Sequence, residues 1–542
     1  MSPGAQFPGR NHLFDMRLVT CDLHLPLTTR SSNPLPHYAL RAMAPYIAVL
    51  LSALLLWAAF PPLDLGPLAF VAPIPFFWAI RRVERGSDAV ALGFLWGSVF
   101  FGGLLYWISV LGFIAWFPLT IALGAYFAAY GFIVWSFRLW PAWRWWLIAI
   151  GAWVGMEFIR ARFPFGGFPW GNIGYGAAGF PPLLGTVQWV GPVGWSMLAI
   201  ALSAGVVLML EDRAHNWRFV VDPAVVILLL AIAGSLFAPT ADGTPMRVAI
   251  VQGNSPCPMV HCQNENLRIY ESHLRLTETI PDGGADLVVW AENATGTPYE
   301  PGGNDAVQGA ILEQASRIGA YFLVSGTRIV EPDSFVNVNV LYSPDGIKLG
   351  EYHKRHPVPY GEYVPLRGLL GFIPQLDQVP RDMISGTEPV VFQVGEDGLG
   401  SVISFEGAFA RSIQSIAANG AQMMVVSTNE SSFGETAASD QLIDMTRVNA
   451  AAIGQDLVHA AITGRSTFIT ADGSVAEKSG LYEEAVLFGD LAMRSAGPTL
   501  FTRFPYWPLA LALIFALIGL FWPGEGGIED LVGRRRAERK EN

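Results

Sequence analysis

Three polar clusters in the second half of the chain contain residue types that could do chemistry, and two of them stand at the ends of apolar, β-rich segments. Glu292 comes directly after the segment DLVVWA. Ser404 and Glu406 stand within SVISFEG, and Lys354 lies in the short basic segment HKRH. Carboxylates, amines and hydroxyls are the groups that general acid–base and nucleophilic catalysis use. Because α/β folds place their chemistry just after the strands, these clusters are the first candidates for an active site.

Lys354 is notable because of the composition of the whole chain. Only four of the 34 basic residues are lysines, at positions 348, 354, 478 and 540. A chain that uses arginine almost everywhere keeps lysine where a compact ammonium group serves better than a planar guanidinium. On this argument alone, a solvated surface lysine is an equally good interpretation.

The elements that would position these residues alternate between strand and helix. Short β-rich segments stand at Met246–Val251, Asp286–Trp290, Tyr321–Ser325, Ser401–Phe405 and Met423–Ser427. Helix-like segments lie between several of them, at 263–280 and 304–318. Strands that alternate with helices predict an α/β sandwich for this part of the chain.

The composition of the chain excludes several classes of protein. The chain has 542 residues, of which 52% are hydrophobic and only 15% are charged, and its net charge is −11. Soluble globular proteins carry about 25% charged residues, so an ordinary cytosolic enzyme is excluded. Disorder and nucleic-acid binding are excluded as well. The 18 Trp and 34 Phe fit a chain that meets lipid, and an integral membrane protein is predicted.

Apolar segments from Ala44 onward predict about eight transmembrane helices, judged against the roughly 20 residues that a span needs. They lie near 44–59, 67–80, 88–108, 112–137, 145–160, 190–210, 219–238 and 506–522. The second is short and is interrupted by Pro73 and Pro75.

The orientation follows from the arginines in the short loops, because cytoplasmic loops carry the excess of Lys and Arg. Arginines precede the first span and follow every even-numbered one, whereas Arg160 and Arg162 are the exceptions in the alternate loops. The residues that set this pattern are Arg41, Arg81, Arg82, Arg85, Arg138, Arg144, Arg213, Arg218 and the tail Arg534–Arg536. The soluble part is therefore expected on the outer face of the membrane.

Five regions are expected along the chain. They are a polar N-terminal extension (1–43), a membrane region of about seven spans (44–239), a soluble α/β domain (240–503), a last span (504–523) and a basic cytoplasmic tail (524–542). Cys257 and Cys262 are the only cysteines of the soluble domain. They form a small disulfide in an oxidising exterior or serve as small hydrophobic residues.

Several ordered motifs resemble those of a known family. Trp290-Ala291-Glu292, Tyr352-His353-Lys354 with the following VPYGEYVP, and Ile403-Ser404-Phe405-Glu406 resemble the Glu, Lys and nucleophile blocks of the nitrilase superfamily. Together with the spans they resemble its membrane-bound branch, the apolipoprotein N-acyltransferases. Further matching segments are Phe60-Pro61-Pro62, Gly93–Gly97, Gly167–Trp170 with Gly174-Tyr175, Val251–Asn254 and Ser427–Asn429 with Phe433-Gly434.

The resemblance implies a fold, a site and a reaction. It implies an extracytoplasmic nitrilase-like αββα sandwich on a bacterial inner-membrane protein that needs no cofactor. The partners would be a phospholipid acyl donor, diacylated apolipoproteins and membrane lipid, without nucleic acid. By position, Glu292 would be the general base, Lys354 would stabilise the oxyanion, and Glu362 and Glu406 would be supporting carboxylates.

The most serious departure from the family pattern is at Ser404, which stands where the family has its nucleophilic cysteine; smaller departures are at Ala291, Ser432 and 448–452. Three functions are weighed on this basis. The chain is an acyltransferase, a catalytically silent relative that binds lipoproteins as a scaffold, or an amidase-like hydrolase. A transporter fits less well, because the spans contain few charged residues, chiefly Asp64, Glu157 and Arg160. A histidine relay from His353 or His356 to Ser404 is less expected than a structural role for both.

Overall fold

The computed structural model describes residues 35–260 and 262–522, and the predicted tail 524–542 lies outside them. The first half of the chain is helical. Its α-helices are α1 (Leu35–Trp57), α2 (Pro73–Arg82), α3 (Gly86–Leu104), α4 (Phe113–Ser136), α5 (Ala142–Arg160), α6 (Pro181–Leu184), α7 (Val187–Glu211), α8 (Arg213–Asn216) and α9 (Arg218–Leu236). Short 3₁₀ helices are η1 (Gly66–Phe70), η2 (Tyr106–Leu111) and η3 (Ile173–Gly179). α15 (Leu500–Arg503) and α16 (Trp507–Phe521) close the described chain.

Helices stand at all eight places where spans are expected. Among the described residues, four are long and apolar enough to cross a membrane: α3, α4, α7 and the stretch Arg213–Leu236, which joins α8 and α9. Two apolar helices, Ala42–Trp57 within α1 and α16, are shorter, and α2 has only 10 residues. Four candidate spans are thus confirmed, and the number eight stays a prediction.

α3 and α4 pack closely through glycines, as membrane helices do where small residues let backbones approach. A Cβ on Gly93 would lie 2.1 Å from the carbonyl oxygen of Phe127, and one on Gly131 would lie 2.8 Å from that of Ala89. Larger residues at either glycine would push the two helices apart.

The second half of the chain forms two β-sheets. The first has the order β12-β1-β2-β3-β4-β5, with β6 paired to β4, and the second has the order β11-β10-β9-β8-β7. The strands are β1 (Pro245–Gln252), β2 (Leu287–Gly296), β3 (Tyr321–Glu331), β4 (Ser334–Tyr342), β5 (Lys348–His353), β6 (Asp382–Met383), β7 (Val391–Val394), β8 (Asp397–Ile403), β9 (Met423–Thr428), β10 (Leu457–Ala461), β11 (Thr467–Ile469) and β12 (Ala485–Ala492). β1, β2 and β3 run parallel, and so do β8, β9 and β10.

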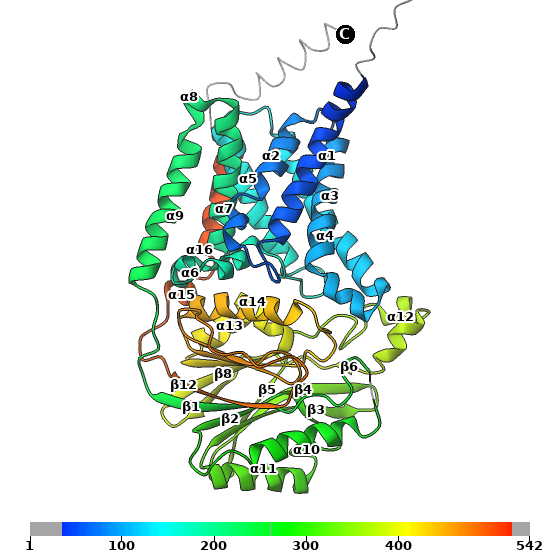
Figure 1. Cartoon of the computed structure of the whole chain (residues 1–542), viewed down its shortest axis with the longest axis vertical. Coiled ribbons are helices and arrows are strands. Elements are labelled where there is room, and N and C mark those ends of the chain that lie inside the picture. The colour runs from blue at the N-terminus through cyan, green and yellow to red at the C-terminus, as the bar shows by residue number, and fades with distance from the viewer. Residues whose placement is uncertain (1–34, 261, 523–542) are drawn as a thin grey trace, which may run out of the picture. The chain divides into compact units, whose positions relative to one another are not determined.

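The two sheets pack face to face between two pairs of helices (Figure 1). These helices are α10 (Glu265–Thr277) and α11 (Asp305–Ile318) on one side and α13 (Ala410–Ala418) and α14 (Ala438–Ile453) on the other; the short α12 (Arg367–Leu370), η4 (Pro374–Gln378) and η5 (Ser404–Ala408) complete the domain. Alternation along the strands builds the layers, because successive side chains point to opposite faces. In β1, Val248 and Ile250 enter the core between the sheets, whereas Ala249 and Val251 enter the core under α10 and α11. The predicted α/β sandwich is confirmed, with its layers in the order helix, sheet, sheet, helix (Figure 1).

α14 also faces the membrane helices. Leu442, Met445 and Val448 belong to the same apolar core as the side chains of α3, α5 and α7. α14 therefore packs against the sheet on one side and against the helices of the membrane region on the other.

Candidate active site

Glu292 reaches the space between the two sheets because β2 is irregular at this point. Leu287, Val289 and Ala291 face the core between the sheets, so regular alternation would turn residue 292 toward α10. The pairing of β2 with β3 changes register between Trp290 and Thr295, and Asn293 has φ 62°. This irregularity re-aims the carboxylate, which is a common use of bulges near active sites.

The carboxylate of Glu292 is buried and receives donors from three segments. Its Oε1 accepts from Nδ2 of Asn337 at 2.7 Å and lies 3.2 Å from Nζ of Lys354. Its Oε2 accepts from the backbone N–H of Asn429 at 2.6 Å. Burial raises the pKa of Glu292, and the negative charge of Glu362 adds to this rise. The charge of Lys354 and, to a smaller extent, the Asn337 and Ser404 side chains oppose part of it. Glu292 is therefore a stronger base than an exposed glutamate.

Lys354 is held between two carboxylates. Its Nζ lies 2.6 Å from Oε1 of Glu362 and 3.2 Å from Oε1 of Glu292, and only 1% of its side chain is exposed. Burial lowers the pKa of Lys354, but the two carboxylates outweigh this effect and the pKa is raised. The lysine is a fixed ammonium ion at neutral pH, as an oxyanion-stabilising cation must be.

Ser404 is the first residue of η5 and stands at the sharp turn where β8 ends. The sequence predicts a strand as far as Phe405, but β8 ends at Ile403, and this part of the prediction is wrong. The strand ends there because Ser404 has φ 56°, in the left-handed region that disfavours a side chain with a Cβ. A strained strand-to-helix turn presents a nucleophile in other hydrolase folds, and such strain concentrates at active sites. The Ser404 side chain is among the groups that lower the pKa of Glu292.

Glu406 braces the turn and does not contact the Lys354 ammonium group. Its Oε2 accepts from the Tyr352 hydroxyl at 2.7 Å and from the Ile403 N–H at 2.9 Å. Its Oε1 accepts the N–H groups of Arg355 and His356 at 2.8 and 3.0 Å. The carboxylate thereby joins the end of β8 to the segment that carries Lys354.

The structure brings Glu292, Lys354, Glu362 and Ser404 together and adds residues that the sequence analysis missed. Asn337 lies on β4, which no predicted segment covers, and its carbonyl accepts the Lys354 N–H at 2.9 Å. A signal was present, because asparagines at 337 and 339 alternate with valines in VNVNV. Polar residues at every second position of an apolar strand indicate a polar layer between sheets.

Six aromatic side chains, here called the aromatic cluster, lie beside the Ser404 turn. They are Trp107, Phe168, Trp170, Phe405, Phe409 and Phe433. The ring centroid of Phe405, the residue after Ser404, lies 5.7 Å from that of Phe168 and 4.8 Å from that of Phe409. Because Trp107 and Phe168 belong to the membrane region, apolar ring contacts connect that region to the turn.

The charged residues at the end of α5 hold the loop that carries Phe168 and Trp170. The Arg160 guanidinium donates to the carbonyls of Phe168 at 2.8 Å and Trp170 at 2.6 Å, and also to the Asn172 side chain. Glu157 accepts the Ile173 N–H at 3.0 Å. These charges therefore support a loop beside the site, and they give no support to a transport pathway.

Neither neighbouring histidine is directed at Ser404. A ring nitrogen of His353 lies 2.8 Å from Glu351, and Nε2 of His356 lies 2.6 Å from Nη2 of Arg411. The same arginine donates to the carbonyls of Ala161 and, at 2.8 Å, Gly166. The structural role expected for both histidines fits these contacts.

His356 makes the stability of the protein sensitive to acid. Burial and the charges of Arg411, Arg355 and Lys354 lower the pKa of His356 to about 4, whereas an unperturbed histidine titrates near 6.5. Between these values the unfolded chain binds a proton that the folded chain rejects, so stability is full above about pH 6.5 and is lost as the pH falls toward 4.

We expect His356→Gln to reduce this acid sensitivity by about 1–3 kcal/mol, because glutamine still accepts from Arg411 but cannot be protonated. The measurement is chemical denaturation in detergent at pH 7 and pH 4.5. Equal losses of stability in both proteins would contradict the assignment to His356.

Among the described residues, no group of three or more His, Cys, Asp or Glu side chains is arranged to hold a metal ion.

Comparisons with known proteins agree with the two regions. Residues 52–205 match the apolipoprotein N-acyltransferase N-terminal domain, and residues 247–499 match the carbon-nitrogen hydrolase family. The solved structure of an amidase from Nesterenkonia sp. is 21% identical to this chain and has a TM-score of 0.34. The match covers 47% of this chain and 93% of the amidase chain. The two family-model matches, together with the two-sheet sandwich and the candidate spans, define a membrane-bound protein of the nitrilase superfamily.

Curated relatives narrow this class. Apolipoprotein N-acyltransferase from Geobacter metallireducens is 31% identical over 85% of this chain and 91% of the relative. The enzyme of the same name from Gloeobacter violaceus is 28% identical over 89% of this chain and 94% of the relative. The one from Nitrosomonas europaea is 26% identical over 88% of this chain and 96% of the relative. The chain belongs to the apolipoprotein N-acyltransferase family.

Proposed function

We propose that the protein transfers an acyl chain from a phospholipid to the α-amino group of the N-terminal diacylglyceryl-cysteine of lipoproteins. The observation that carries the proposal is the buried Glu292–Lys354 pair beside the strained Ser404 turn. Family membership supplies the substrate class. The aromatic cluster supports it, because both substrates are anchored in lipid and would approach from the membrane helices.

In the first half-reaction Glu292 takes the proton of the Ser404 hydroxyl as its oxygen attacks the ester carbonyl of the phospholipid. Lys354 stabilises the oxyanion of the tetrahedral intermediate. The carbon–oxygen bond to the glycerol breaks, and the leaving oxygen takes the proton from Glu292 and departs as lysophospholipid. The acyl chain remains as an ester on Ser404.

In the second half-reaction the lipoprotein amine attacks this ester. Glu292 accepts a proton from the nitrogen, the carbon–oxygen bond to Ser404 breaks, and the serine oxygen regains a proton. The amide product leaves and the site is restored. Glu362 keeps the lysine charged and in place, and Glu406 keeps the turn aligned with it.

The finer topology belongs to the same proposal. The chain crosses a bacterial inner membrane about eight times, and its soluble domain lies on the outer face. The alternation of arginines in the loops supports this orientation. The disulfide between Cys257 and Cys262 also supports it, because disulfides persist in oxidising compartments.

The test is intact-protein mass spectrometry of the detergent-purified protein after incubation with phospholipid. We expect a mass gain of one acyl chain on Ser404, stable to neutral hydroxylamine and discharged by a diacylglyceryl peptide. A protein that gains no acyl chain but binds the diacylglyceryl peptide would favour the scaffold function.

A further inference from the structure

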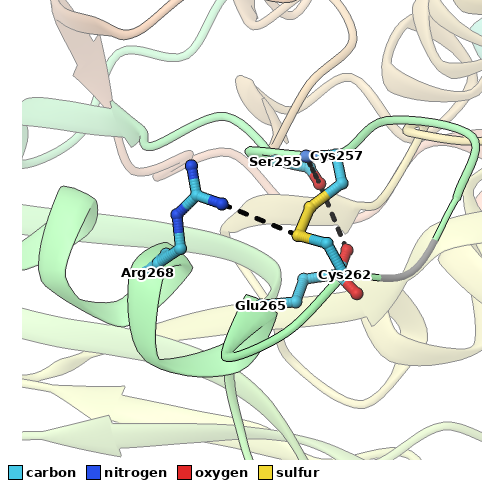
Figure 2. Close-up of a disulfide and its surroundings, with 5 residues drawn as sticks. All are labelled: Ser255, Cys257, Cys262, Glu265 and Arg268. Carbon is cyan, nitrogen blue, oxygen red and sulfur yellow. Dashed lines mark hydrogen bonds between the residues drawn. A yellow bond between two sulfur atoms is a disulfide. The ribbon is translucent and has the colours of Figure 1, made fainter.

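A disulfide closes a short loop directly after β1. Cys257 and Cys262 are bridged, with their Cα atoms 6.1 Å apart. Figure 2 shows the guanidinium of Arg268, on α10, directed at Sγ of Cys262, 3.7 Å away. Oγ of Ser255 accepts the Cys257 N–H at 3.2 Å and donates to Glu265 at the same distance. Both ends of the loop are thus attached to α10, Cys262 through Arg268 and Cys257 through Ser255 and Glu265.

Three hydrogen bonds lead from this loop to the carboxylate of Glu292. The N–H of Met259 donates to the carbonyl of Ser431 at 3.1 Å. The N–H of Ser431 donates to Oδ1 of Asn429 at 3.0 Å. The N–H of Asn429 then donates to Oε2 of Glu292 at 2.6 Å. The disulfide loop therefore contacts the segment that supplies one of the donors to the proposed base.

The tip of the loop is restrained by the bridge more than by packing. Met259 is 43% exposed and Val260 is 66% exposed, so few apolar contacts hold them. Met259 also has φ 75°, a conformation that a residue with a side chain rarely adopts without outside restraint. Segments with little buried apolar surface open locally when nothing else restrains them. Opening the bridge should therefore free the Met259 N–H from Ser431.

We propose that the Cys257–Cys262 disulfide is a positioning element for the active site, which holds the segment 429–431 so that the Asn429 N–H stays on Glu292. This inference rests on the proposed function for its consequence in catalysis, because Glu292 acts there as the base. The cysteines touch neither substrate nor reacting atoms and act only through the loop. A bridge that merely stabilises the folded domain is the competing explanation.

The first experiment measures the geometry without any activity. All proteins carry Cys21→Ser, so that Cys257 and Cys262 are the only cysteines that can react. Amide hydrogen exchange is compared among the oxidised protein, the reduced protein and the Cys257→Ser/Cys262→Ser variant. We expect exchange in peptides covering 429–431 to rise about tenfold or more once the bridge is absent, because the segment then opens locally. Unchanged exchange in these peptides would overturn the proposal, whether or not the protein transfers acyl chains.

The second experiment reads the effect on the base. A donated hydrogen bond stabilises a carboxylate, so weakening the Asn429 bond should raise the pKa of Glu292. We expect the acid limb of the transfer rate to move up by about half a pH unit in the bridge-free variant, which lowers the rate about threefold on the acid side. Reductant should reproduce the shift in the Cys21→Ser protein and have no effect on the bridge-free variant.

The outcomes separate the explanations. A lower melting temperature with an unmoved acid limb would mean that the bridge only stabilises the fold, and the positioning role would be rejected. If the oxidised protein itself transfers no acyl chain, the proposed function fails, while the exchange experiment still decides whether the bridge positions the segment 429–431.

Discussion

Replacing Glu292 by glutamine is expected to lower acyl transfer by about 10²–10⁴-fold, the usual contribution of a general base. Glutamine keeps the shape of the side chain and still offers an oxygen to Asn337 and Lys354, but it cannot take the proton from Ser404. The same reasoning predicts an acid limb in the wild-type rate. Because burial raises the pKa of Glu292, this limb lies above the ordinary glutamate value of about 4.3, and activity falls as the pH drops through it.

Glu362→Gln is the matched control for this prediction. It also removes one negative charge beside Lys354, since Glu362 lies 2.6 Å from Nζ, but no contact with Ser404 is involved. We expect a loss of about tenfold, which reflects weaker positioning of the lysine. Steady-state transfer and single-turnover acylation of both variants check the difference. Equal losses in the two variants would mean that charge balance around Lys354, and not proton transfer to Glu292, limits the reaction.

The sequence predicted much of the site because the candidate catalytic side chains stand at or near the ends of strands. The segments before Glu292 and Ser404 are recognisable strands, and the rarity of lysine marked Lys354. These features reflect local patterns, since a buried strand and a lone ammonium group can each be recognised without the rest of the fold. Three of the four residues that meet in the site were therefore predictable from their own neighbourhoods, and the motif order supplied Glu362.

Other features depend on partners far away in the sequence. The direction of Glu292 follows from an irregular pairing of β2 with β3, which strict alternation does not predict. The end of β8 follows from the φ of Ser404 and from Glu406, which accepts the Ile403 N–H and the N–H groups of the Lys354 segment. The Asn429 N–H is a backbone group and leaves no trace in the residue types. Such contacts become visible only when both sheets are in place.

Replacing Ser404 by cysteine is expected to raise acyl-enzyme formation by at least about tenfold at neutral pH, because a thiol titrates near 8.5 and is intrinsically the better nucleophile. The site around it is unchanged by the substitution. Both side chains have a Cβ, so the strained backbone at φ 56° is equally costly for either. Glu292 and Lys354 remain as base and cation. The new intermediate is a thioester, so neutral hydroxylamine should cleave it, whereas the wild-type ester should resist.

Two controls make this increase interpretable. Ser404→Ala should carry no acyl chain, which fixes the position of the adduct. Ser401→Cys makes the same exchange three residues earlier, within β8, at a buried hydroxyl that accepts from Asn339 at 2.5 Å in the layer between the sheets. It should gain neither an adduct nor activity. If wild type and Ser404→Cys are both free of adduct while the fold and lipid binding persist, then the machinery around residue 404 has been lost along with the thiol. A competent base and cation would acylate a cysteine at this turn, so the absence of an adduct would show that they are not competent. The chain would then act on lipoproteins by binding alone.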